Sequence, residues 1–575
     1  MATISLGSIY NQGGKTIVGG GSSNLDTDSL INSLVEAKRL PAVRLESNIE
    51  KNTAKIDALN ELSGILETFR DAANFLRNPP GVGNTTENIF NYRSATVSSN
   101  TGSASNYLSA TVETGTDPSS YSMTVDQLAT KQTRVTNTFG VADQDTQVVG
   151  GGGPFNAGTL TLGPSGITIE LTDGDTINQM LSKINAVKAD SGVEVNSVKV
   201  ADGSYRLTFK ATTTGTDQNF DFTAANPAFF SGGLGFFSET DAVNANVTID
   251  GTQVTRQTNN ISDLVDGITF SATQETPPGT TLTVGVTADT ELAKNAVLNF
   301  VDAYNEFRVF ASRQTETNDD GERVSEAVIG SNNSLRSLIN SVGSEISAIV
   351  SGVAGNNSLD AIGIELTDFA GDDETPFTRN ILQVDDGKLD AAFASDFEAV
   401  RKVFEFNAVA DNPNLVVFSR TNGLNTNDIS YNIDQTNGVY EATVDGTTYT
   451  LESSPLTSGG VSLTGPDGSP LAGLNVLYTD TDDVTVNLSL TQGVADRLYN
   501  IMSVSLNDED GIVAQEIDSL DERNVRLEED IARIDTIVEN YRFTLLERFS
   551  ALEAAISSVN SILQLLDAQA EARSA

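Results

Sequence analysis

The chain has 575 residues, enough for several domains with cores of their own, and 34 basic against 78 acidic residues give it a net charge of −44. A field of that sign makes nucleic acids and anionic membrane surfaces poor partners. Cysteine, histidine and tryptophan are absent, which excludes disulfide frameworks, thiolate nucleophiles, serine–histidine triads and most zinc sites. We therefore predict that the chain is not an enzyme and has no catalytic residues, cofactor or metal.

The first 22 residues are rich in glycine and serine and show little periodicity, so we predict a flexible tail over 1–22. This stretch lacks the basic region and the continuous apolar region of a cleavable signal peptide. No stretch of the chain approaches the ~18 uninterrupted apolar residues of a membrane span. We predict no membrane insertion, and export would need a route without a cleaved signal peptide.

Two helical patterns follow the tail. Asn24 or Asp26 can cap the first pattern, which carries Leu30 and Leu34 and is predicted to stop near Pro41. The second pattern runs over 45–76 with apolar residues three and four positions apart.

From about Ser94 the apolar period changes to two, with runs of threonine, valine and tyrosine between glycine, aspartate and asparagine. One short helical pattern interrupts these strands over 176–187. We predict β-rich outer domains over 95–286, in two subdomains.

Helical patterns return at Asp289 and are predicted over 289–307, 334–349 and 389–404. A further β-rich segment occupies 411–489. The closing helices are predicted to begin near Gln492.

The last stretch, Ile512 to Ala575, contains neither glycine nor proline. Its apolar residues recur at steps of three and four, with one extra four-residue step after Leu545. This heptad pattern with one stutter predicts a helix of roughly 95 Å that packs against other helices. The predicted seam consists of Leu527, Ile531, Ile534, Val538, Tyr541, Leu545, Phe549, Leu552, Ile556, Val559 and Leu563.

Each seam side chain gains roughly 1.5–3 kcal/mol on burial, so the helix needs partners. Those partners are either other subunits or the N-terminal helix of the same chain, and the length of the apolar run favours other subunits. We predict that the seam, with Leu30 and Leu34, forms an oligomer or filament interface.

Together these patterns predict an α+β multi-domain protein. Both chain ends form a terminal α-helical coiled-coil stalk and a helical domain, into which the β-rich domains are inserted. The legs are 23–48 and 527–575, and the helical stalk domain is 49–94, 287–410 and 490–526.

Acidic clusters could suggest calcium, but none has the alternating ligand spacing and terminal glutamate of an EF-hand loop. We interpret them as solvated turns. They lie at 318–322, 372–374, 479–483 and 507–511.

Several motifs resemble one family in the same order along the chain. The N-terminal motif is Leu25-Asp26-Thr27-Asp28-Ser29-Leu30, followed by Leu34-Val35, Leu40-Pro41 and Arg44-Leu45. Later matches are 124–129, the IN-motif-like part at about 155–225, 259–269, 300–305, 359–364, 387–390 and 548–561. Together they resemble the flagellar filament-capping proteins, the hook-associated protein 2 family. Val559 stands where that family usually has methionine, and the segment from about 405 to 490 is longer than usual.

The resemblance implies a structural cap: a homo-oligomeric ring at the distal tip of the bacterial flagellum that promotes folding and insertion of exported flagellin and prevents its loss. The implied partners are other copies of the chain, flagellin, hook–filament junction proteins, a flagellar export chaperone and, in some relatives, a host surface. The implied location is extracellular, reached by the flagellar type III route without a cleaved signal peptide.

Two alternatives remain open. Another flagellar axial protein, a flagellin or a hook–filament junction protein, shares part of the motif set, although the 25–45 and 549–561 matches argue against it. A surface adhesin would instead use the β domains to bind glycans or host proteins.

Overall fold

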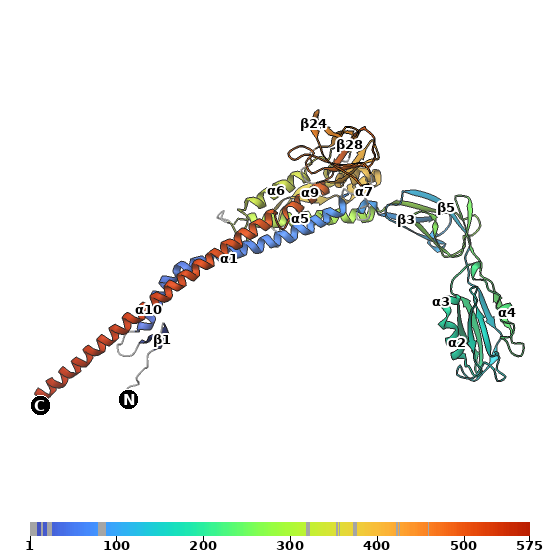
Figure 1. Cartoon of the computed structure of the whole chain (residues 1–575), viewed down its shortest axis with the longest axis horizontal. Coiled ribbons are helices and arrows are strands. Elements are labelled where there is room, and N and C mark those ends of the chain that lie inside the picture. Colours follow the sequence, from blue (N-terminus) through green and yellow to red (C-terminus); the bar gives the residue numbers. More distant parts are fainter. Residues whose placement is uncertain are drawn as a thin grey trace. The chain divides into compact units, whose positions relative to one another are not determined.

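The structure is a computed structural model of the whole chain. It describes all residues except 1–7, 13–14, 20–25, 79–87, 318–322, 352, 354, 356, 372–376, 421–423, 425, 458 and 575, and it describes only the backbone of 8–12, 15–19 and 571–574. The chain forms two compact units, Met1–Val82 with Ala296–Ala575, and Gly83–Asn295. Helices lie at both chain ends and β-sheets between them, so the predicted α+β multi-domain class is confirmed (Figure 1).

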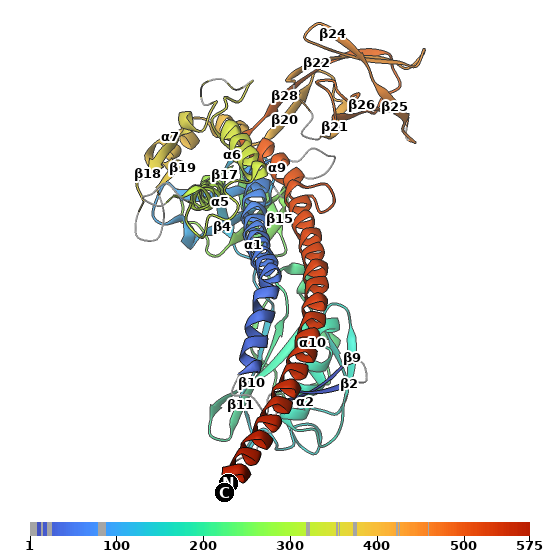
Figure 2. The same cartoon turned by 90° about the vertical axis from the view of Figure 1, so that its left-hand side faces the viewer.

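Two long helices dominate the first unit, α1 (Thr27–Leu76) and α10 (Ile512–Ser574). They lie side by side in both views (Figures 1 and 2). Side-chain hydrogen bonds join them at four residue pairs among the described residues: Thr27 with Glu553, Asn32 with Arg542, Arg39 with Asp535, and Asn52 with Asn524. Because the partner number falls as the α1 number rises, the two helices are antiparallel.

Helix α1 continues through Pro41, so the predicted stop there is wrong. Proline has no N–H to donate to the carbonyl four residues back, at Ala37, which normally kinks or ends a helix. Here contacts flank the proline on both sides: Arg39 Nε donates to Asp535 Oδ1 at 2.8 Å, and Ala42 is fully buried. Packing against the rest of the unit therefore outweighs the local cost.

An aromatic cluster joins α1 to α5 (Thr290–Thr315) in the helical core. The Phe69 ring centroid lies 5.4 Å from that of Phe300, 5.9 Å from Tyr304 and 6.4 Å from Phe307. Tyr304 donates its hydroxyl to the Asn380 carbonyl at 2.7 Å, and burial raises its pKa to about 12. This cluster fixes α5 against the N-terminal helix.

Shorter elements complete the helical part of this unit: α6 (Asn333–Ile346), α7 (Asp386–Ser395), α8 (Phe397–Phe404), α9 (Val494–Ser505), and the hairpin of β18 (Ile364–Phe369) and β19 (Thr378–Val384). The single helix predicted over 389–404 is wrong, because the chain forms α7 and α8 instead. Asp396 separates them, and its side chain accepts from the Ala399 N–H at 2.9 Å. An aspartate in that role starts a new helix.

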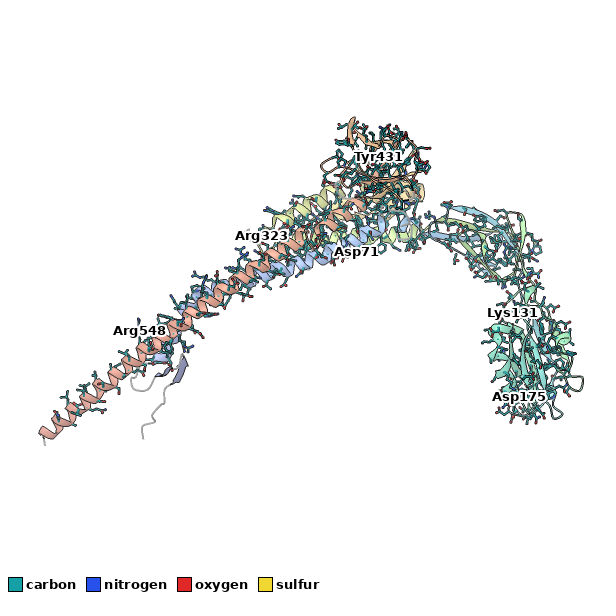
Figure 3. All side chains as sticks on the ribbon, in the orientation of Figure 1. Asp71, Lys131, Asp175, Arg323, Tyr431 and Arg548 are labelled. Atoms are coloured by element: carbon teal, nitrogen blue, oxygen red, sulfur yellow. The ribbon has the colours of Figure 1, made fainter. Side chains whose placement is uncertain are left out.

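A β-sandwich is inserted between α8 and α9. One sheet has the order β20-β28-β22-β23-β24, and the other β21-β27-β26-β25. Its core includes Tyr431, whose pKa burial raises (Figure 3). The strands are β20 (Phe406–Ala410), β21 (Leu415–Ser419), β22 (Asp428–Asp434), β23 (Val439–Val444), β24 (Thr447–Thr450), β25 (Glu452–Pro455), β26 (Val461–Thr464), β27 (Asn475–Tyr478) and β28 (Val484–Gln492).

The second unit contains two β-rich subdomains. In the first, a five-stranded sheet ordered β14-β13-β5-β17-β3 faces a three-stranded sheet ordered β15-β16-β4 across one core. The strands are β3 (Arg93–Ser99), β4 (Leu108–Val112), β5 (Ser119–Gln127), β13 (Ala245–Ile249), β14 (Thr252–Arg256), β15 (Asn260–Val265), β16 (Ile268–Ala272) and β17 (Leu282–Ala288).

The second subdomain packs α2 (Ile177–Ala186) on a sheet ordered β10-β11-β6-β12, over a core rich in phenylalanine. Thr176 and Gln179 form a reciprocal capping box that starts α2. Its other elements are β6 (Thr133–Thr136), β7 (Phe139–Gly140), β8 (Gly158–Leu162), β9 (Ile167–Leu171), α3 (Lys188–Ser191), β10 (Val193–Ala201), β11 (Ser204–Ala211), α4 (Phe222–Ala225) and β12 (Phe236–Thr240).

Several boundaries differ from the predicted ones. Residues 88–94 and 287–295 belong to the second unit, and β17 pairs with β3 as far as Ala288 opposite Arg93. Strands β20 and β28 extend the sandwich to 406–492. The predicted tail lies partly outside the described residues, but β1 (Ser8–Gln12) and β2 (Lys15–Gly19) form a hairpin that the sequence did not predict, and β2 lies against α10.

We expect Phe69→Ala to destabilise the helical domain by about 3–5 kcal/mol, because it opens a cavity among three aromatic rings. Phe75→Ala is the matched control on the same helix, since Phe75 is 55% exposed. Denaturant unfolding followed by far-UV circular dichroism measures both. Equal effects of the two variants would contradict the assignment of this core.

The carboxylate of Asp175, labelled in Figure 3, is held by Lys183 Nζ at 2.6 Å and by the Thr172 N–H at 2.8 Å. Burial raises the pKa of this group, but the hydrogen bonds from Lys183 and Thr172 outweigh it, so the pKa is lowered. Because the folded-state pKa of Asp175 is lowered, its ionised carboxylate stabilises the fold at pH values above the unfolded-state pKa of about 3.9. This stabilisation is lost as the pH falls through the folded-state pKa.

We therefore expect Asp175→Asn to lower the stability of the 133–240 subdomain at neutral pH, and the gap to the unchanged chain to close in acid. Hydrogen exchange of β11 across the pH range measures it. Asp202→Asn removes only the exposed pair with Lys199 and is the control. A gap independent of pH would refute the assignment.

Candidate functional site

The candidate site is the leg, defined here as α1 from Thr27 to Asn52 paired with α10 from Asn524 onward. Its apolar contact is built from buried Ile31, Leu545 and Leu546, with Val35 and Phe549 partly buried beside them. Leu545 and Leu546 are adjacent in sequence, and both face α1 at the predicted stutter. A four-residue step shifts the seam around the helix, so two neighbouring positions share it there.

The predicted seam residues on α10 fall into three groups by exposure. Two are buried, six are half-buried, and three, all from Leu552 onward, are exposed. The buried ones are Val538 and Leu545; the half-buried ones are Leu527, Ile531, Ile534, Tyr541, Phe549 and Ile556; the exposed ones are Leu552, Val559 and Leu563. Burial thus fades toward the C-terminus.

The two interface residues predicted on α1 are exposed in this chain. Leu30 is 50% exposed and Leu34 38% exposed, whereas Ile31 is buried against Leu545 and Leu546. The stripe that includes Ile31 repeats every seven residues: Ile31, Lys38, Leu45, Asn52, Leu59 and Leu66 stand on one heptad position. Leu30 and Leu34 lie beside that stripe and are left uncovered by this chain.

Helix α10 extends beyond the start of α1. Thr27, the first residue of α1, donates its hydroxyl to Glu553 at 3.1 Å, so the segment from Ala554 to Ser574 runs past the paired helix for roughly 30 Å at ~1.5 Å per residue. We call this segment the overhang. Every side chain from Ser557 to Ala570 is exposed.

One broad face of the overhang is apolar. Positions 556, 559, 562, 563, 565 and 566 lie within about half of the helix circumference at 100° per residue, opposite Ser557, Ser561 and Gln564. Val559, Ile562, Leu563, Leu565 and Leu566 are each more than half exposed. Contiguous exposed apolar surface of this kind marks an interaction site.

Helix α10 also contains an 18-residue window, of mean hydropathy 1.3 and only 6% buried, that is long and apolar enough to cross a membrane. The sequence prediction of no membrane insertion did not anticipate this. The same window meets the requirements of a helix that packs against other helices, because both need a continuous apolar face.

Exposed ion pairs lie on the leg, and one of them joins the two helices. Arg39 contacts Glu46 at 2.6 Å and Asp535 at 2.8 Å, and the bonds to Glu46 and then Asp535 raise its pKa. All three side chains are more than a third exposed, so solvent screens these pairs and they contribute little to stability. Arg548, labelled on α10 in Figure 3, lies farther along the same helix.

No group of three or more metal-ligating side chains occurs among the described residues. The predicted turns at 318–322 and 372–374 lie outside them. The other two clusters lie at exposed turns, and Asp483 accepts from Thr436, which lowers the pKa of Asp483.

A multi-domain α+β chain with an uncovered apolar helix end is a protein built for assembly. Comparison with known proteins gives the class. The family model for the flagellar hook-associated protein 2 C-terminus matches 242–561, more than half of the chain. The model for the N-terminus of the same proteins matches 23–132, and the flagellin hook IN motif matches 149–213.

Relatives agree. The flagellar hook-associated protein 2 of Salmonella typhimurium is 27% identical over 506 residues, which is 84% of this chain and 98% of that protein. The B-type protein of Pseudomonas aeruginosa is 26% identical over 412 residues, covering 67% and 79%. The structure of the Escherichia coli flagellar cap protein FliD, domains D1-D2-D3, aligns over 81% of this chain and 99% of its own, with 20% identity and a TM-score of 0.45. The chain belongs to the flagellar hook-associated protein 2 family, and the predicted resemblance is confirmed.

We expect Leu552→Asp to weaken self-association, because it places a carboxylate on the apolar face where α1 ends. Val198→Asp is the control: Val198 is also about half exposed but lies on β10 in the other unit. Sedimentation velocity of both full-length variants over a range of concentrations measures the effect. We expect at least a tenfold weaker association for Leu552→Asp, equivalent to about 1.4 kcal/mol, and little change for the control. The reverse ranking would contradict this assignment of the site.

Proposed function

We propose that this chain caps the distal end of the flagellar filament as a ring of identical copies, with the legs seated against the filament end. Membership of the hook-associated protein 2 family supports the cap role. The observation that carries the proposal for this chain is the overhang, an apolar helix face that α1 is too short to cover.

The overhang suits contact with other helices. Its apolar face spans about half of the circumference, wider than the two positions per heptad that a single coiled-coil partner covers. More than one neighbouring helix therefore fits around it. Helices of adjacent copies and of flagellin subunits at the filament end are the partners we propose.

In this role the ring holds exported flagellin at the growing tip, favours its folding and insertion, and prevents its loss into the medium. We propose hook–filament junction proteins as the first surface on which the ring assembles, and an export chaperone that covers the C-terminal helix before secretion by the flagellar type III route. Adhesion to a host surface would be a separate role, and no feature of the described residues points to it specifically.

The test is complementation of a strain from which this gene is deleted. Three forms are supplied: the full chain, the chain ending at Ala554, and the full chain carrying Val198→Asp. We expect the full chain and the Val198 control to restore filaments, and the shortened chain to leave short filaments with flagellin in the medium. Electron microscopy and flagellin recovered from the medium measure both.

The shortened chain retains the Thr27–Glu553 bond and the whole α1–α10 pairing, so its domains are expected to stay folded. Normal filaments from a strain carrying it would contradict the role of the overhang. Normal filaments in the deletion strain itself would contradict the cap proposal. Long filaments formed by the purified full chain would indicate a flagellin-like protein instead.

A further inference from the structure

The β-sandwich at 406–492 joins the helical domain at one place. β20 leaves after α8 and β28 returns to α9 as adjacent strands, with Phe406 opposite Gln492. At the crossing, Gly493 N–H donates to the Glu405 carbonyl at 2.9 Å, and a Cβ at Gly493 would lie 2.2 Å from the Phe404 carbonyl carbon. The covalent connection is therefore a two-stranded stalk with no room for a side chain at its base, and such a stalk does not by itself fix the direction of the sandwich.

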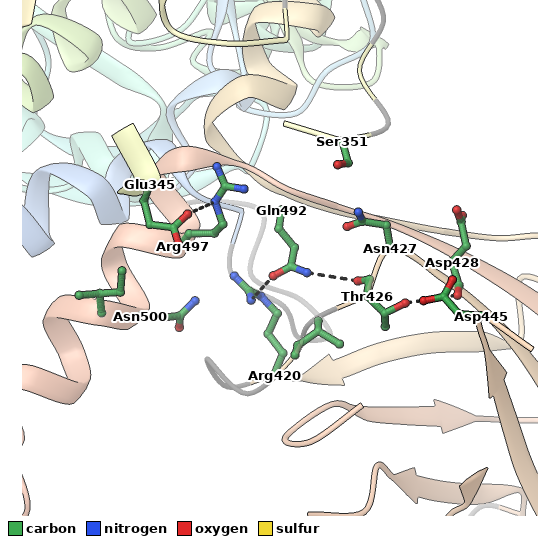
Figure 4. A pocket seen from close by; sticks show the side chains of 12 residues that line it. Glu345, Ser351, Arg420, Thr426, Asn427, Asp428, Asp445, Gln492, Arg497 and Asn500 are labelled. Atoms are coloured by element: carbon green, nitrogen blue, oxygen red, sulfur yellow. Dashed lines mark hydrogen bonds and ion pairs between the residues drawn. The ribbon is translucent and has the colours of Figure 1, made fainter. Parts of the chain in front are cut away.

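Beside the stalk, the contact between the sandwich and the helices contains a cavity of about 810 Å³ (Figure 4). Its described walls are mostly polar or charged. They include Arg420, Thr426 and Gln492 from the sandwich, and Glu345 and Arg497 from α6 and α9. Close apolar packing is not what orients the sandwich on this side.

A buried ion cluster spans the same contact. Asp496 on α9 is completely buried, and its carboxylate contacts the guanidinium of Arg420, whose side chain is 3% exposed. Arg77, just after α1, places NH1 3.9 Å from Asp496 Oδ1. Arg497 Nε lies 2.8 Å from Glu345 Oε2, which ties α9 to α6.

Arg420 is also held on its own side of the contact. NH1 donates to Gln492 Oε1 at 3.2 Å, and the guanidinium carbon lies 4.6 Å from the Phe406 ring centroid. Burial, and then the positive charges of Arg77 and Arg497, lower the pKa of Arg420 to about 9. The side chain is thus a cation at neutral pH, carried by the sandwich and neutralised by the helical domain.

A buried carboxylate and a buried guanidinium are tolerated only when each neutralises the other. We propose that Arg420 and Asp496 form a latch that fixes the orientation of the sandwich on the helical domain. Opening the latch frees the sandwich to swing on its two-stranded stalk, while both domains remain folded on their own cores. Asp496 and Arg420 are positioning residues for a domain whose role the sequence left open.

The test uses the full chain, which has no cysteine of its own. Nitroxide labels on Ser337→Cys of α6 and Thr447→Cys of β24, both exposed, report the distance between the two domains by pulsed electron paramagnetic resonance. We expect one narrow distance distribution, which Asp496→Asn broadens at least twofold. Asp445→Asn is the matched control: Asp445 is exposed, lines the same cavity, and carries the same charge.

Hydrogen exchange of β22 and β28 shows in parallel whether the sandwich remains folded. Broadening with unchanged protection in Asp496→Asn, and no broadening in Asp445→Asn, supports the latch. An unchanged distribution in Asp496→Asn overturns it, as does equal broadening in both variants. If Asp496→Asn also loses protection, Arg420→Lys decides the question, because lysine keeps the positive charge but not the reach or the two-pronged geometry of the guanidinium. In Arg420→Lys, a broadened distance distribution with intact protection supports the latch. An unchanged distribution refutes it.

Discussion

The antiparallel pairing of α1 with α10 is the constraint on which the first unit depends. It joins two segments almost the whole chain apart, and α5 and α9 also pack against α1. One of its polar contacts is an amide pair: Asn52, 5% exposed, stands on the heptad position of the seam and donates to Asn524 Oδ1 at 2.8 Å. A buried amide pair weakens a coiled coil but penalises every register in which the amides miss each other.

That register sets where the leg ends. With Asn52 opposite Asn524, Thr27 falls opposite Glu553, and the remainder of α10 projects past its partner. The uncovered apolar face is therefore a consequence of unequal helix lengths and a fixed register, and needs no unusual sequence at the tip. A slip of one heptad would shift about 10 Å of helix between covered and uncovered states, so the amide pair also determines how much surface is offered to neighbouring molecules.

Much of this was predictable from periodicity, and the exceptions have physical reasons. The C-terminal helix, its stutter at Leu545 and the strands of the outer domains follow from local patterns. The break expected at Pro41 does not occur, because tertiary contacts at Arg39 and Ala42 outweigh a local rule. Leu30, Ile31 and Leu34 are all apolar, but only Ile31 is buried against α10. The seven-residue spacing back from Leu59 and Leu66 distinguishes Ile31, but that spacing passes through the polar Asn52 and Lys38.

The sandwich shows where sequence reasoning ends. Its strands could be predicted, but its attachment could not, because Arg77, Arg420 and Asp496 are distant in sequence and no spacing links them. Nothing in the local pattern distinguishes Asp496 from the many acidic residues on the surface; only the fold makes it a buried counter-charge. The leg and the sandwich contact also differ in kind. The leg leaves apolar surface uncovered, which other molecules can bind, whereas the contact at Asp496 neutralises charge within one chain. The proposed ring of several copies on a filament end uses both: surfaces that other subunits complete, and domains whose direction each subunit fixes for itself.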